Sequence, residues 1–152
     1  MINIDAQNHV KGQSIYLDDI QELQGTLYAL PFDATVAHAK IVSIDLEAAR
    51  QSQGIVAVLT AKDVPGENQI GGIIPDEPLF AEDEVHFRGM AIALIVGDSE
   101  HHCRQAAKLI KVVYDELPVI VDPREAQAKG KLIVPPRTFR LGNTTDAWAQ
   151  CD

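Results

Sequence analysis

The feature that most constrains the fold is a pattern that occurs twice, once on each side of a long loop. Residues 40–65 and 91–118 each read as a β-strand, an acidic residue, a short helix, a second strand and a proline. The two copies share few identical residues, so the pattern indicates common architecture and not an internal repeat. Strands interspersed with short amphipathic helices predict an α+β domain.

The second copy carries the strongest strand and helix signals. Residues 90–96, MAIALIV, are the most apolar run in the chain and predict a central strand. Residues 97–99, GDS, are expected to end this strand and to begin a helix that continues to about Lys108. Four small or apolar residues follow the helical spacing i, i+3, i+4 and i+7, and they are Cys103, Ala106, Ala107 and Ile110. They predict one narrow stripe that packs on the sheet.

A loop rich in glycine and proline, residues 63–84, separates the two copies. It also contains apolar residues at Ile70, Ile73 and Ile74, which are expected to be exposed. A long irregular loop is uncommon in a compact domain unless it serves a function. The residues leave open whether that function is chemistry or contact with another surface.

Composition excludes several classes of function. The 152 residues fit one domain, flanked by a polar arm over residues 1–8 and an extended, linker-like tail over residues 129–152. The net charge of −9 argues against binding to nucleic acid or to an anionic membrane, and the apolar runs are too short to span a bilayer. Two cysteines without a CxxC motif, Cys103 and Cys151, favour a reducing, cytoplasmic location and leave a disulfide between them open.

No catalytic, cofactor-binding or metal-binding set is predicted from spacing. Residues 101–103, HHC, point about 100° apart on a helix and cannot converge on one ion. His38 could act as a general base, but the sequence shows no partner residue for it. The simpler interpretation is that its side chain makes a hydrogen bond at a turn or strand edge. The acids at residues 18–19, 76–77 and 82–84 could act as acid–base pairs or bind a hard cation, but such acids usually cap turns or face solvent.

Longer motifs resemble one enzyme family. Residues 9–20, HVKGQSIYLDDI, are similar to the opening motif HVTGEAxYxDDI of molybdenum hydroxylase large subunits. The match continues in order through AHAKIVSID at 37–45, GIVAV at 54–58, TAKDVPGEN at 60–68, DE at 76–77, FAEDEV at 80–85 and VYDELP at 113–118. These motifs identify residues 9–128 as the α/β hammerhead domain of the xanthine dehydrogenase and aldehyde oxidase family.

The resemblance implies a fold and a reaction. The expected fold is an α/β hammerhead in which two short-to-medium helices pack on a mixed sheet. The expected complete protein is a cytoplasmic, oligomeric oxidoreductase, of the kind used in purine catabolism, that hydroxylates purines, other N-heterocycles or aldehydes with water. Molybdopterin-bound molybdenum, [2Fe–2S] clusters and FAD would carry its electrons, all outside this chain. The fragment alone is then inactive and serves as scaffold against the iron–sulfur and molybdenum-binding domains or subunits.

The resemblance also assigns a role to Ile73 and Ile74. In the family, the apolar pair after a glycine of the central loop lines the funnel that leads to the molybdenum, so both isoleucines are expected at the substrate channel. The alternative is that both side chains pack beneath their own loop. For the chain as a whole, the alternative is a free-standing interaction or assembly module that uses the hammerhead fold.

Overall fold

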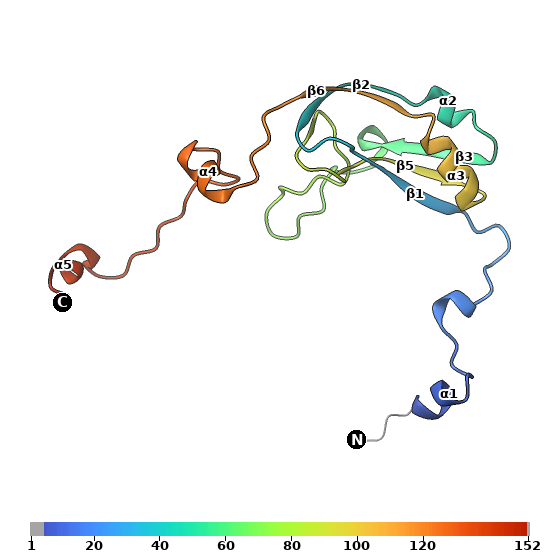
Figure 1. Ribbon diagram of the computed structural model, residues 1–152, viewed down its shortest axis with the longest axis horizontal. Coiled ribbons are helices and arrows are strands. Elements are labelled where there is room, and N and C mark those ends of the chain that lie inside the picture. The colour runs from blue at the N-terminus through green and yellow to red at the C-terminus, as the bar shows by residue number, and fades with distance from the viewer. Residues whose placement is uncertain (1–4, 152) are drawn as a thin grey trace. The chain divides into compact units, whose positions relative to one another are not determined.

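The computed structural model describes residues 5–151 of the chain (Figure 1). Contacts between residues divide the chain into two units, Met1–Leu117 and Pro118–Asp152. All strands of the described residues belong to the first unit, and the second contains two short helices. The residues proposed for function therefore lie in the first unit.

One sheet has the predicted apolar strand at its centre. Its three antiparallel strands follow the order β1 (Tyr28–Asp33), β5 (Ala91–Gly97) and β3 (Ile55–Thr60). Ile92 and Ile95 are both fully buried, although they are three positions apart along the strand and so point to opposite faces. Alternate residues of a strand face opposite sides, so both faces of β5 are covered. This burial explains the uninterrupted apolar run and confirms the prediction of a central strand.

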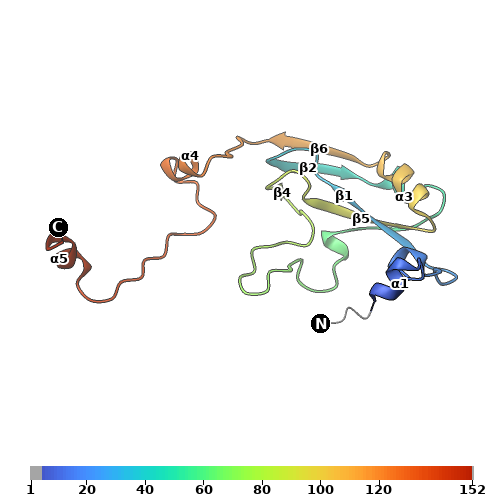
Figure 2. The ribbon, with the colours of Figure 1, turned by 60° about the horizontal axis from the view of Figure 1, so that its bottom comes forward.

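The other strands form a second sheet beside the first (Figure 2). Its antiparallel order is β4 (Glu84–Val85), β2 (Ala39–Asp45) and β6 (Lys111–Glu116). The α+β fold class is confirmed, but the strands divide between two antiparallel sheets where we expected one mixed sheet. The reason is that strand partners are set by contacts distant in sequence, which local hydrophobic patterns do not specify.

Helix α3 (Glu100–Ala107) begins and packs as the sequence predicts. Ser99 is its N-cap, and its hydroxyl oxygen accepts a hydrogen bond from the His102 backbone N–H at 3.3 Å. Cys103 and Ala106 are fully buried, and the helix packs against β1 and β5. The shorter helix α2 (Glu47–Arg50) lies against β3.

The core consists of two clusters on the two faces of β5. One cluster lies beneath the helices and comprises Leu46, Ala49, Val58, Ala93, Ile95, Cys103, Ala106 and Ile110. The other comprises Ala34, Ala81, Val85, Met90 and Ile92. Because the second cluster includes residues just before and within β4, it fixes the end of the long loop to the sheets.

Short elements occupy the remainder of the described chain. In the predicted arm over residues 1–8, residues 1–4 lie outside the described part, and α1 (Ala6–Val10) begins within the rest. Single 3-10 turns cover Leu17–Asp19 and Ala61–Asp63. The second unit contains α4 (Pro123–Ala128) and α5 (Thr144–Ala149). Between Asp5 and Cys151, no helix has the length and apolar character that crossing a membrane requires.

Candidate functional site

The long loop between β3 and β4 is closed by the side chain of Asn68. Its amide Nδ2 donates to the Phe80 carbonyl oxygen at 2.8 Å, and its Oδ1 accepts from the Phe80 backbone N–H at 2.9 Å. One side chain thus pairs with both backbone groups of Phe80, as a neighbouring strand would. This pair of hydrogen bonds joins the two ends of the segment 69–79, which we call the loop tip.

Hydrogen bonds within the loop tip give it a defined conformation. The Ile70 N–H donates to the Glu77 carbonyl oxygen at 2.8 Å. The Gln69 Oε1 accepts from the backbone N–H of Gly71 at 2.5 Å and of Glu77 at 3.1 Å. A Cβ at position 71 would collide with the Ile74 carbonyl oxygen, so the tip requires glycine there. The tip is held in one shape by these contacts although it contains no helix or strand.

We expect Asn68→Ala to loosen the loop tip without unfolding the sheets. Two hydrogen bonds of about 0.5–1.5 kcal/mol each are lost, so local opening becomes about 5- to 150-fold more frequent. Amide hydrogen exchange of residues 69–79 should accelerate by that factor, while exchange in β5 stays unchanged. Asn68→Asp is the matched control, because it keeps the acceptor for the Phe80 N–H and should give an intermediate rate. Equal exchange rates in all three proteins would contradict a closing role for Asn68.

The loop tip exposes the apolar pair predicted for the substrate channel. The Ile73 side chain is 97% exposed and that of Ile74 is 44% exposed. The alternative in which both isoleucines pack beneath their own loop therefore does not hold for Ile73. Exposed apolar side chains on an ordered loop are typical of a contact surface.

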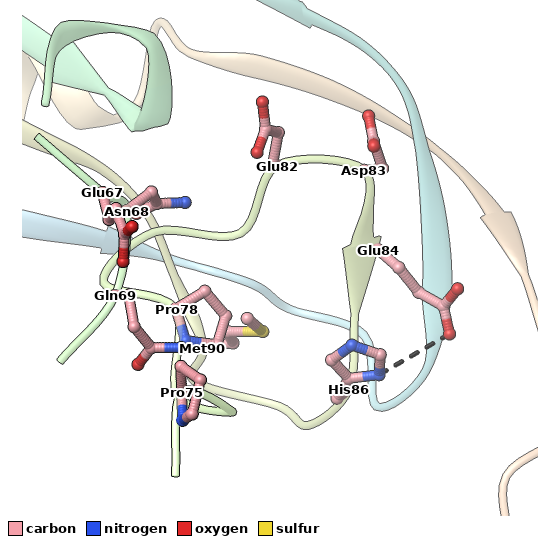
Figure 3. Close-up of a pocket in the computed structure, with 10 residues that line it drawn as sticks. All are labelled: Glu67, Asn68, Gln69, Pro75, Pro78, Glu82, Asp83, Glu84, His86 and Met90. Carbon is pink, nitrogen blue, oxygen red and sulfur yellow. Dashed lines mark ion pairs between the residues drawn. The ribbon is translucent and has the colours of Figure 1, made fainter. Parts of the chain in front are cut away.

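An acidic groove of about 550 Å³ lies between the loop and β4 (Figure 3). Its lining residues are Glu67, Asn68, Gln69, Pro75, Pro78, Glu82, Asp83, Glu84, His86 and Met90. The structure thus brings the acidic group 82–84 together with Glu67, whereas Asp76 and Glu77 do not line the groove. Four carboxylates around one groove repel an anionic ligand and favour a cationic one.

Asp19 and Cys103, which lie outside the groove, make contacts that are typical of structural residues. The Asp19 carboxylate accepts a hydrogen bond from the Tyr16 backbone N–H at 2.9 Å, as a cap does. The Cys103 thiol is buried and donates to the Tyr28 carbonyl oxygen at 3.6 Å, and its burial raises the pKa of the thiol. A buried thiol with a raised pKa is a poor nucleophile at neutral pH. Both Cys103 and Cys151 are free thiols.

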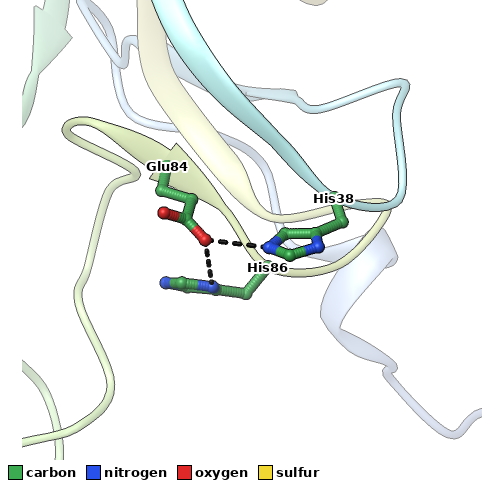
Figure 4. A group of neighbouring side chains, drawn as sticks. All are labelled: His38, Glu84 and His86. Atoms are coloured by element: carbon green, nitrogen blue, oxygen red, sulfur yellow. Dashed lines mark hydrogen bonds and ion pairs between the residues drawn. The ribbon is translucent and has the colours of Figure 1, made fainter. Parts of the chain in front are cut away.

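His38, Glu84 and His86 form a cluster that the sequence analysis did not find (Figure 4). The Glu84 Oε1 lies 2.8 Å from His38 Nε2 and 3.6 Å from His86 Nδ1. The hydrogen bond from His38 is the main reason why the pKa of Glu84 is lowered from its ordinary value. His38 does have a partner, and it lies 46 positions away in the sequence.

The only local signal for this cluster is the spacing of Glu84 and His86. Residues i and i+2 of a strand face the same side, so these two side chains are neighbours wherever β4 is extended. The third member joins because β4 pairs with β2, with Ala39 opposite Val85 and Lys40 opposite Glu84. That pairing is a tertiary contact, which no local pattern of residues indicates.

Comparison with known proteins identifies the class. Residues 11–118 match the family model described as "Aldehyde oxidase and xanthine dehydrogenase, a/b hammerhead domain". The chain belongs to this family and contains its hammerhead domain.

Its relatives are large oxidoreductases. The chain is 38% identical to the xanthine dehydrogenase/oxidase of Gallus gallus over 152 residues, which cover 100% of this chain and 11% of that protein. It is 42% identical to xanthine dehydrogenase 1 of Arabidopsis thaliana over 125 residues, or 82% of this chain and 9% of that protein. The chain therefore spans about a tenth of the length of the curated relatives it matches.

Solved structures have the same fold. The aldehyde oxidoreductase of Desulfovibrio desulfuricans superposes with a TM-score of 0.74 at 30% identity, covering 85% of this chain and 16% of that one. The CO dehydrogenase of Oligotropha carboxidovorans gives a TM-score of 0.73 at 29% identity, covering 83% of this chain and 16% of that one. In both cases the chain corresponds to a small part of a larger polypeptide.

Proposed function

We propose that this chain is a structural domain of the molybdenum-binding subunit of a xanthine dehydrogenase-like enzyme. The proposed reaction of the complete protein is the water-dependent hydroxylation of a purine, another N-heterocycle or an aldehyde. The observation that carries this proposal is the family match over residues 11–118, together with 38% identity to a xanthine dehydrogenase/oxidase. Within the chain, residues 9–128 are the proposed hammerhead domain and residues 129–152 the linker toward the cofactor-binding domains.

The residues of this chain do not fit the cofactors of such an enzyme. Molybdopterin carries a phosphate, and the groove is lined by four carboxylates, which repel an anion. An iron–sulfur cluster of the common type takes four cysteine thiolates, and the chain has two cysteines, of which Cys103 is buried. Molybdopterin, the [2Fe–2S] clusters and FAD are therefore proposed to bind in other domains or subunits, which this domain contacts.

Ile73 and Ile74 are the proposed contribution of this chain to the substrate channel. Their exposure on a tip held by internal hydrogen bonds supports the proposal, because a channel wall needs apolar surface at a fixed position. The chain supplies no proposed catalytic residue. The complete enzyme is proposed to be a cytoplasmic oligomer in which the iron–sulfur and molybdenum-binding parts pack against this domain.

Dye reduction by the complete protein tests the proposed reaction. We expect a purine, an N-heterocycle or an aldehyde to reduce an artificial electron acceptor in a substrate-dependent way. The isolated 152-residue chain should give no reduction under the same conditions. Absence of substrate-dependent reduction by the complete, cofactor-loaded protein would overturn the proposal, and so would activity of the isolated chain.

Ile74→Ala in the complete enzyme tests the channel role separately. Removing the side chain widens the proposed channel, so kcat/KM for a bulky substrate should rise relative to that for a small one, by about tenfold. Ile70→Ala is the matched control, because it removes an exposed isoleucine of the same loop tip outside the pair. An unchanged ratio of kcat/KM between bulky and small substrates in Ile74→Ala would contradict the channel role and leave the proposed reaction standing.

A further inference from the structure

We propose that His38, Glu84 and His86 form a binding site for a divalent transition-metal ion of the Zn²⁺ type. The three residues offer two imidazole nitrogens and one carboxylate oxygen, and these ligand atoms all lie within 4.8 Å of one another. The proposed ligands do not include Ile73 or Ile74, and the site needs no cofactor of the complete enzyme.

Strand pairing is what places the three ligands together. In the antiparallel pair of β2 and β4, Ala39 lies opposite Val85, so the next positions outward, 38 and 86, face each other. Glu84 in β4 and His86, which directly follows β4, lie two positions apart in the chain and face the same side, which makes Glu84 the diagonal neighbour of His38. Val85 and Ala39 between them are fully buried, so the backbone that carries the ligands is held by the core.

The distances are close to those that a metal needs. Two ligands bound tetrahedrally at 2.0–2.1 Å lie about 3.4 Å apart. The separation of 3.6 Å between His86 Nδ1 and Glu84 Oε1 already matches this value. His38 Nε2 lies 2.8 Å from the same oxygen, so metal binding requires this pair to open by about 0.6 Å. All three side chains are 31–59% exposed, so an ion can reach the ligand atoms from solvent.

The ligand types select the class of metal. Imidazole suits Zn²⁺ and its transition-metal neighbours, whereas Mg²⁺ and Ca²⁺ take oxygen ligands. Three protein ligands leave a position for water, as in other open zinc sites. Glu82 and Asp83 point away from Glu84 and His86 in Figure 3, so they add negative potential without serving as ligands. Lys40, opposite Glu84 in the register, opposes this potential and limits the affinity.

A metal at this position would join the start of β2 to the end of β4. Residue 84 follows directly after the long loop, so the ion would fix the C-terminal end of that loop to the second sheet. The alternative is that the cluster is only a hydrogen-bonded ion pair. The two interpretations differ in whether His86, the most exposed member, contributes to binding of an added ion.

Titration of the purified 152-residue chain with ZnCl₂, followed by calorimetry, tests the proposal. The exposed Cys151 thiol is a competing zinc ligand, so all proteins carry Cys151→Ser. We expect one Zn²⁺ per chain, and we expect His86→Ala and Glu84→Gln each to weaken binding by about tenfold or more. His101→Ala is the matched control, since it removes an exposed histidine on α3 outside the cluster and should bind as the parent does.

Two further measurements exclude indirect effects. Co²⁺ in place of Zn²⁺ should give visible d–d absorption bands in the parent and in His101→Ala, with a changed spectrum in His86→Ala. MgCl₂ should give no binding heat at the same concentrations. Zinc binding of equal strength in the parent and in folded His86→Ala, or no one-to-one binding by the parent, would overturn the proposal.

Discussion

Replacing Ile95 with alanine is expected to lower the free energy of unfolding by about 2–5 kcal/mol. Ile95 lies in the middle strand β5, is fully buried, and belongs to the cluster beneath α3. Alanine removes three buried carbon atoms and leaves a cavity that packed neighbours on three sides cannot fill. Small domains have only about 5–15 kcal/mol of stability in total, so the loss is a large fraction of it. Urea denaturation of the 152-residue chain, followed by circular dichroism, measures the change.

Two matched variants separate the cavity from other causes. Ile95→Val keeps the β-branched shape and should cost about 0.5–1.5 kcal/mol. Val56→Ala, on the neighbouring strand β3, truncates a side chain that is 62% exposed and should change stability by less than about 0.5 kcal/mol. If Ile95→Ala and Val56→Ala had equal effects, β5 would not be the centre of the core.

Gly97→Ala is expected to be the second severe change, although it adds a single methyl group. A Cβ at this position would lie 2.9 Å from the Cys103 Sγ, 2.9 Å from the Gly54 carbonyl oxygen and 3.1 Å from the Ile55 Cδ1. The carbonyl belongs to the backbone and cannot rotate away, so strand β5 or its neighbour must shift. Overpacking of this kind costs about 1–3 kcal/mol, measured by the same denaturation.

The expected loss of stability depends on which glycine is replaced by alanine. Gly66→Ala places a Cβ where no atom lies within 4 Å, so it should change stability by less than about 0.5 kcal/mol. The double variant with Cys103→Ala should recover only part of the loss, because the Gly54 carbonyl stays in place. Full recovery would show that the sulfur alone causes the collision.

The sequence was sufficient to predict those elements that are determined by residues close together in the chain. The apolar run from Met90 to Val96 predicted the central strand, since a strand covered on both faces has no position for a polar side chain. Ser99 and the stripe that includes Cys103 predicted α3, because capping and helical spacing act within a few residues. The family motifs identified the α+β domain as a hammerhead, which residue spacing alone did not distinguish from other α+β domains.

Partnerships between strands could not be predicted in the same way. Nothing near residue 40 specifies that β2 takes β4 on one side and β6 on the other. The division into two sheets is therefore a property of the folded chain. The same limit hid the His38 cluster, since Glu84 in β4 and His86 directly after it reach His38 only through that pairing.

For the loop, the sequence predicted the exposure of Ile70, Ile73 and Ile74 correctly, but it did not predict the means by which the tip is held. An asparagine in a polar loop has many uses, and only the folded chain shows that Asn68 pairs with Phe80. The role of Ile73 and Ile74 in a substrate channel stays a prediction. Its test requires the complete enzyme, because the surface they would face belongs to other domains.

The closure by Asn68 divides the loop and the sheets into parts whose residues are constrained differently. Residues outside the closure contribute to packing, so changes there are limited by the stability of the domain. Exposed side chains inside it, such as that of Ile73, contribute little to packing, so they can change with little effect on folding, whereas Gln69 and Gly71 hold the tip in its conformation. The exposed surface of the loop tip can therefore be altered by mutation while the sheets that carry it keep their packing.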